Sequence, residues 1–116
     1  LKELSLHLDQ RPGERFFWFT TTGWMMWNLL IGGLLVGSTV LIYDGNPAFP
    51  DMGVLWRFAE ASGMTFFGTS AGYITALMKS DVAPGRNHDL SRLVGVGSTG
   101  SPLPPEGFDW VYEHVK

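Results

Sequence analysis

Short apolar runs alternate along the chain with longer segments in which apolar residues recur every three or four positions. Runs of the first kind are typical of strands buried on both faces, and segments of the second kind are typical of amphipathic helices. The expected strands are residues 15–20, 39–44, 64–68 and 92–97. The pattern therefore predicts one helix followed by four strand–helix units.

Capping and turn residues indicate where the helices begin. The second helix is expected over about residues 24–36. Asp51 can cap the third helix, and Thr69 or Ser70 can cap the fourth. A proline suits the first position of a helix, so the fifth should begin near residue 104 or 105. This last helix carries one apolar stripe, formed by Phe108, Val111, Tyr112 and Val115.

The alternation of strands and helices predicts the fold class. It indicates an α/β protein with three layers, α/β/α, and about four mainly parallel strands. Ligands of such sheets bind beyond the carboxyl ends of the strands. The loops expected at those ends are also the loops with the most unusual residues, and they are "TTTGWMM", "YDGNPAFP", "GTSAG" and "GSTGSP".

Composition narrows the possible classes of function. The 116 residues suffice for one domain with a core. The absence of cysteine excludes disulfides and thiolate metal sites, and the three histidines show no metal-ligand spacing, so no metal site is expected. A formal net charge of −3 gives no electrostatic reason to expect a nucleic acid partner.

One uncharged segment, residues 24–43, is about as long as the 20 residues that span a bilayer. Its second half turns β-branched and ends at the turn signal "DGNP", and no basic cluster flanks it. The pattern favours a buried helix that runs into a buried strand, so we expect no membrane partner. The chain starts without Met and ends inside an expected helix, so residues 1–116 are interpreted as one fragment of a larger domain.

The stretch "GVGSTG" matches the spacing G-x-G-x-x-G of dinucleotide sites. In those sites the third glycine leads directly into a helix, whose N-terminus faces the pyrophosphate. Here Pro102, Pro104 and Pro105 delay the helix, and the expected acidic residue would fall beyond the chain. The stretch does not predict a dinucleotide site, although several small polar groups gather in it.

The stretch "GTSAG" matches G-x-S-x-G between a strand and a helix, which is the context of a nucleophile elbow. Ser70 would be the nucleophile of a serine hydrolase, with Asp81 or Asp89 and then His88 or His114 as its partners. The alternative is a helix cap in a tight turn. A third possibility, outside the enzymes, is a small α/β interaction module.

Four segments together resemble one family: "FFWFTTTGWMMWN", "YDGNPAFPD", "FFGTSAGY" and "VGSTGSPLPPEGFDWVYEHV". They resemble the acetoacetyl-CoA synthetases (acetoacetate–CoA ligases) of the AMP-forming, adenylate-forming superfamily, over nearly the whole chain. The resemblance implies a cytoplasmic enzyme that activates acetoacetate with ATP, assisted by Mg²⁺. CoA then displaces AMP from the acyl-adenylate to form the thioester.

The resemblance also implies roles for individual residues. The residues implied to pack along adenine are Gly100, Ser101 and Pro102. The residues implied to line the acyl pocket are Trp24, Met25, Met26 and Thr99. Those implied to lie near the CoA nucleotide are Ala48 and Phe49.

Three positions depart from the acetyl-CoA synthetase pattern. Ser101 stands in place of a glutamate, Ala71 in place of a proline and Ala48 in place of an asparagine. The family's phosphate loop would precede Leu1, and its acidic and lysine groups would follow Lys116. We therefore expect no catalytic residue within these 116 residues and no activity from them alone. The bare sheet edge of such a piece should favour self-association.

Overall fold

The computed structural model describes residues 3–47, 49 and 51–115. Four strands form one sheet in the order β2-β1-β3-β4, and every neighbouring pair is parallel. The strands are β1 (Arg15–Trp18), β2 (Thr39–Leu41), β3 (Phe66–Ser70) and β4 (Gly95–Thr99). The predicted fold class is confirmed, with β2 and β4 at the two edges.

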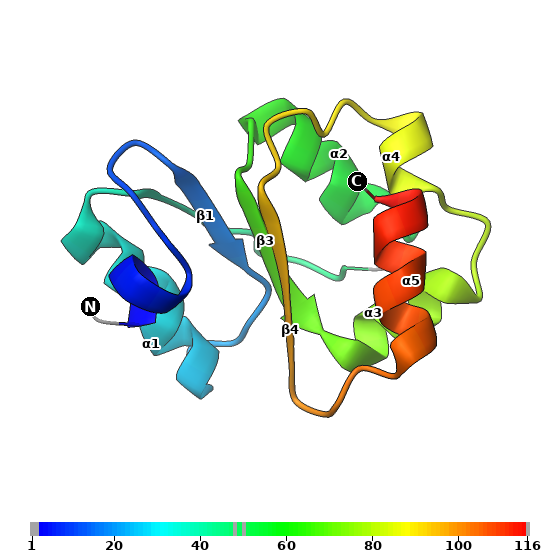
Figure 1. Ribbon diagram of the computed structural model, residues 1–116, viewed down its shortest axis with the longest axis horizontal. Coiled ribbons are helices and arrows are strands. Elements are labelled where there is room, and N and C mark those ends of the chain that lie inside the picture. The colour runs from blue at the N-terminus through cyan, green and yellow to red at the C-terminus, as the bar shows by residue number, and fades with distance from the viewer. Residues whose placement is uncertain (1–2, 48, 50, 116) are drawn as a thin grey trace.

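Helical segments cover both faces of this sheet (Figure 1). One face carries a π-helical turn, η1 (Glu3–His7), with α1 (Met25–Gly32) and the 3₁₀ turn η2 (Gly33–Val36). The other face carries α2 (Val54–Ser62), α3 (Ala71–Met78), α4 (Pro84–Asn87) and α5 (Pro105–His114).

The alternation of side chains along each strand divides the core in two. Phe17 and Phe67 point to the α2 side, where Trp56 stacks on Phe67 with ring centroids 4.2 Å apart. Phe16 and Trp18 point to the α1 side. β1, β2 and β3 therefore contribute side chains to both cores, which explains why their sequences read as continuous apolar runs.

Two glycines make room for the largest side chain on the α1 side. A Cβ added at Gly68 would overlap the indole of Trp18, and one added at Gly97 would lie 2.7 Å from it. Gly68 and Gly97 are register partners on β3 and β4. The indole of Trp18 therefore lies flat across two neighbouring strands, on a surface that only glycine leaves open.

Several local predictions need correction. The first helical segment is a π-helical turn, and the polar loop before β4 contains the short helix α4, which was not expected. Asp51 does not cap α2, because the helix begins at Val54, and Asp51 instead accepts a hydrogen bond from the amide of Gly53. Among the described residues, no helix combines the length and apolar character needed to cross a membrane.

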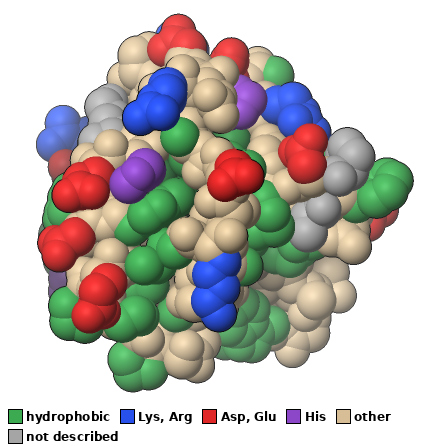
Figure 2. Space-filling model, turned by 90° about the vertical axis from the view of Figure 1, so that its right-hand side faces the viewer, with side chains coloured by type: hydrophobic (Ala, Val, Ile, Leu, Met, Phe, Trp, Pro, Cys, Tyr) green, Lys and Arg blue, Asp and Glu red, His purple; other side chains and the backbone are tan. Residues whose placement is uncertain are grey.

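The predicted stripe of the last helix exists but is only partly buried. Val115 joins the core, whereas Phe108 and Tyr112 are exposed, at 53% and 74% of their surface. On this side of the molecule, apolar side chains interrupt a surface that carries both acidic and basic groups (Figure 2). The stripe therefore faces a surface groove, because nothing in the described chain covers its outer half.

Candidate ligand site at the carboxyl edge of the sheet

All four strands run in one direction, so the loops that follow them meet at one edge of the sheet. The loop from β1 to α1 and the loop from β4 to α5 both lie there (Figure 1). Parallel sheets bind ligands at this edge. The topology thus brings the predicted acyl residues and the predicted adenine residues to one end of the molecule.

The loop after β4 is open and locally unusual. Gly100 has φ of 93°, a conformation that L side chains rarely adopt, and no atom lies within 4 Å of an added Cβ there. Ser101 and Pro102 are exposed. The backbone of the predicted adenine loop can therefore be approached closely by a flat ring.

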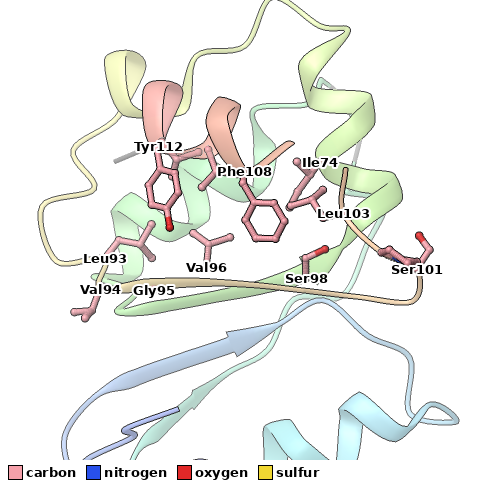
Figure 3. A pocket seen from close by; sticks show the side chains of 13 residues that line it. Ile74, Leu93, Val94, Gly95, Val96, Ser98, Ser101, Leu103, Phe108 and Tyr112 are labelled. Carbon is pink, nitrogen blue, oxygen red and sulfur yellow. The ribbon is translucent and has the colours of Figure 1, made fainter. Parts of the chain in front are cut away.

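Ser101 and Pro102 also line a cavity of about 730 Å³ between β4 and α5 (Figure 3). Phe108 projects into it from α5, and Ser98 faces it from β4. The sequence predicted an apolar stripe on this helix but did not assign it to a cavity wall. The available signal was that this stripe follows the proline-rich loop "SPLPPE".

The last two residues of β4 carry hydroxyls that lack partners. The Oγ of Ser98 and the Oγ1 of Thr99 are both buried, with no hydrogen-bond partner within the described chain. Ser98 faces the cavity with α5. Thr99, the next residue along the strand, faces the α1 side. Each face of the sheet thus ends at an unused polar group.

The predicted acyl residues differ in exposure. Trp24 is the residue before α1 and is partly exposed, at 37% of its surface. Met25 is exposed over 65% of its surface, whereas Met26 is exposed over only 3% and packs with Trp18 in the core. Trp24 and Met25 are therefore accessible from solvent at this edge, whereas Met26 belongs to the buried core.

The two residues implied to lie near CoA belong to the loop after β2. Ala48 lies outside the described residues. Phe49 is 71% exposed. This large exposed ring is available for stacking, while the role implied for Ala48 stays a prediction.

Ser70 has a structural use in this fold. It is the N-cap of α3, and its Oγ accepts a hydrogen bond of 3.1 Å from the amide of Tyr73. This confirms the helix-cap interpretation of "GTSAG". Burial raises the pKa of the Tyr73 phenol, so that side chain remains neutral, and its hydroxyl donates to the carbonyl oxygen of Met52.

The two histidines considered as partners of Ser70 lie at the other end of the sheet. His88 precedes β4, and its Nδ1 lies 3.4 Å from a carboxylate oxygen of Glu60. His114 ends α5, and its Nδ1 lies 3.1 Å from the carbonyl oxygen of Trp110. Because Ser70 ends β3 at the carboxyl edge, the parallel topology separates it from both rings. Ser70 therefore pairs with neither His88 nor His114, and the hydrolase interpretation is wrong.

Asp89, another residue of the loop before β4, is fully exposed. Hydrogen bonds from Ser91 lower the pKa of its carboxyl group. This carboxylate also lies at the amino end of the sheet, because its loop leads into β4. It therefore has no part in the chemistry at the opposite edge.

Comparison with known proteins decides the family. The profile of the family described as "AMP-binding enzyme" matches residues 2–116. The chain belongs to this family. The sequence is 55% identical over all 116 residues to an acetoacetyl-coenzyme A synthetase of Rhizobium meliloti and 43% identical to one of Danio rerio. It is also 36% identical, over 97% of the chain, to a malonamoyl-CoA synthetase of Penicillium aethiopicum.

A solved structure agrees with these relatives. The acetoacetyl-CoA synthetase of Streptomyces lividans matches 97% of this chain with a TM-score of 0.94 and 55% identity. The chain spans 18% of the length of that protein and 17–18% of the curated relatives. The resemblance to AMP-forming acyl-CoA synthetases is therefore confirmed in both sequence and fold, for this part of such a protein.

Proposed function

We infer that this chain is part of an acetoacetate–CoA ligase that forms AMP. The observation that carries the proposal is the 55% identity, over the full chain, to acetoacetyl-CoA synthetases, together with the TM-score of 0.94. In the proposed reaction, a carboxylate oxygen of acetoacetate attacks the α-phosphorus of ATP and pyrophosphate leaves. The CoA thiol then attacks the acyl carbon, loses its proton and expels AMP.

In this proposal the adenine ring lies along the backbone of Gly100, Ser101 and Pro102. The open space at Gly100 and the exposure of the next two residues support this placement. Exposed amide and carbonyl groups in such a loop can form hydrogen bonds with the edge of the ring. The short side chain of Ser101 leaves the approach clear.

The acyl group is proposed to lie beyond the end of β4, between Thr99 and the start of α1. Trp24 and Met25 would form its outer wall, with Met26 packed behind them. Methionine suits such a wall because its side chain is flexible and polarizable. Phe49 would stack near the CoA nucleotide, with Ala48 beside it in sequence.

The groups that handle the phosphates and Mg²⁺ are proposed to lie outside this chain. Among the described residues, no three His, Cys, Asp or Glu side chains lie close enough to hold a metal ion. No step through Mg²⁺ is therefore assigned to this chain. We propose that residues 1–116 form one piece of the larger adenylate-forming domain, and that they supply binding walls without catalytic groups.

The experiment that tests this proposal measures acid-dependent turnover in the full-length ligase that carries this chain. With ATP and CoA, acetoacetate should give AMP and acetoacetyl-CoA in equal amounts. The 116-residue chain alone should give neither product above a tag-only control. Malonamate is the informative second acid, because one relative is named for it. A full-length enzyme that prefers malonamate, or that releases no AMP with acetoacetate, would contradict the assignment.

A further inference from the structure

The loop between β2 and α2 holds a large aromatic ring out into solvent. Phe49 is exposed over 71% of its surface. Its position is nevertheless set by the backbone, because its amide donates a hydrogen bond to the carbonyl oxygen of Asn46 in a tight turn. A rigid exposed ring suits stacking against a flat partner, since it buries a large area and has few side-chain torsions to lose.

The path of this loop follows the carboxyl edge of the sheet. β2 is an outer strand, and β1 separates it from β3. Tyr43, just after β2, packs on Phe19, which follows β1, with ring centroids 6.5 Å apart. Met52, just before α2, lies beside Tyr73 in the first turn of α3, the helix after β3. The loop therefore passes the end of β1, on the side of the sheet away from the loop after β4.

Two phenol hydroxyls fix the backbone on either side of Phe49. The hydroxyl of Tyr43 donates to the carbonyl oxygen of Asn46, at 3.4 Å. The hydroxyl of Tyr73 donates to the carbonyl oxygen of Met52, also at 3.4 Å. Burial raises the pKa of the Tyr73 phenol, so this hydroxyl keeps its proton and stays a donor. The loop is thus held three residues before and three residues after the exposed ring.

We propose that Tyr73 is a positioning residue for CoA, which acts through the loop that carries Phe49. The inference rests on the proposed function, in which Phe49 stacks near the CoA nucleotide. A loop that is already fixed loses less conformational entropy when a ligand stacks on it. Without the hydroxyl of Tyr73 the loop loosens, and CoA has to order it on binding. The effect therefore concerns the affinity for CoA and not the adenylation step.

The test measures steady-state kinetics of the full-length ligase with each substrate varied in turn. Tyr73→Phe removes only the hydroxyl and should raise KM for CoA about fivefold, as expected for one neutral hydrogen bond. The value of kcat and the KM values for ATP and acetoacetate should stay unchanged. Thr75→Val is the matched control, because the Thr75 hydroxyl donates to the carbonyl oxygen of Ala71 within α3. It should leave every KM unchanged.

A double-substitution cycle shows whether Tyr73 acts through Phe49. Phe49→Ala should by itself raise KM for CoA at least about fivefold, because a stacking contact is lost. Adding Tyr73→Phe to that variant should raise KM for CoA no further, since the loop has no ring left to position. Two increases that multiply independently would overturn the proposal.

The remaining outcomes also decide the proposal. An unchanged KM for CoA in Tyr73→Phe or in Phe49→Ala would overturn it. An equal rise in KM for all three substrates would do the same, because it would indicate a general structural role. If Tyr73→Phe does not fold, Tyr43→Phe loosens the other side of the loop and must raise KM for CoA only while Phe49 is present. Formation of AMP from acetoacetate by the parent enzyme tests the proposed function separately, since it involves neither substitution.

Discussion

The loops that follow β3 and β4 begin side by side, yet they use their polar groups differently. Ser70 and Thr99 are register partners at the ends of the two strands. Ser70 caps α3 through a hydrogen bond to the amide of Tyr73. The side-chain hydroxyls of Thr99 and its neighbour Ser98 have no hydrogen-bond partner among the described residues. Similar sequences, "GTSAG" and "GSTGS", thus give a structural turn in one case and an open, polar loop in the other.

The position of each strand in the sheet explains the difference. β3 lies between β1 and β4, so its end is enclosed and a helix follows at once. β4 lies at the edge, and a proline-rich stretch separates its end from α5. The N-terminus of α3 uses the hydroxyl of Ser70, whereas no amide in the described part of the chain bonds to the hydroxyl of Thr99. Unused polar groups therefore collect at the edge strand, where a ligand or more polypeptide can meet them.

The largest effect should come from a methyl group placed under Trp18. Gly68→Ala would force the indole off the sheet, because the new Cβ overlaps it. The free energy of unfolding should fall by about 3 kcal/mol, the upper range for overpacked cores. Chemical denaturation at one fixed protein concentration measures it.

Gly72→Ala is the matched control for this substitution. Gly72 lies in α3, the helix that follows β3, and it is exposed. The one described atom within 4 Å of a Cβ added there is the Oγ of Ser70, at 3.9 Å. Alanine should therefore raise the free energy of unfolding by about 0.5–1 kcal/mol, through its higher helix propensity. If both substitutions changed stability alike, the close packing of Trp18 on β3 would be refuted.

A smaller effect concerns the edge position of β4 itself. In the sheet that the described residues form, its outer backbone groups have no neighbouring strand, and Val94 and Tyr112 are exposed beside it. We expect the 116-residue chain to self-associate at micromolar concentration, because open edges pair with other chains. Val94→Lys should weaken the association at least about tenfold, since a charged edge resists pairing. Light scattering over a concentration series measures the change.

Leu35→Lys provides the comparison for this edge variant. Leu35 is as exposed as Tyr112 but lies in η2, on the other face of the sheet. It should leave the association unchanged. If the chain scatters light as a monomer at every concentration, the open edge of β4 does not pair with other chains. Equal effects of both lysines would place the contact elsewhere.

The smallest effect is the difference in stability expected when Ser70, after β3, and Ser101, after β4, are each replaced by alanine. Ser70→Ala removes the cap of α3 and should lower the free energy of unfolding by about 1 kcal/mol. Ser101→Ala, in the exposed loop after β4, should change it by less than about 0.5 kcal/mol. Neither serine should react with a fluorophosphonate probe, because His88 and His114 lie at the other end of the sheet from Ser70. Labelling that depends on Ser70 would restore the hydrolase interpretation.

The sequence by itself predicted the α/β class, the four strands and a helix cap at Thr69 or Ser70. These follow from local physics, since apolar runs, helix periodicity and capping residues act over a few positions. The sequence also predicted that the candidate residues lie near one another, because they follow strands of a parallel sheet and the carboxyl ends of such strands meet at one edge. The roles of the candidate residues came from family resemblance, and local patterns alone left Ser70 open to two interpretations.

Only the tertiary structure decided which side chains meet. The order β2-β1-β3-β4 placed β4 at an edge and set His88 at the far end from Ser70. The same order laid Trp18 across Gly68 and Gly97, residues 50 and more positions further along the chain. Strand pairing of this kind depends on the burial of both faces at once, so no short window of sequence contains it. The unpaired hydroxyl of Thr99 is a consequence of that pairing, because its neighbours come from other strands and helices.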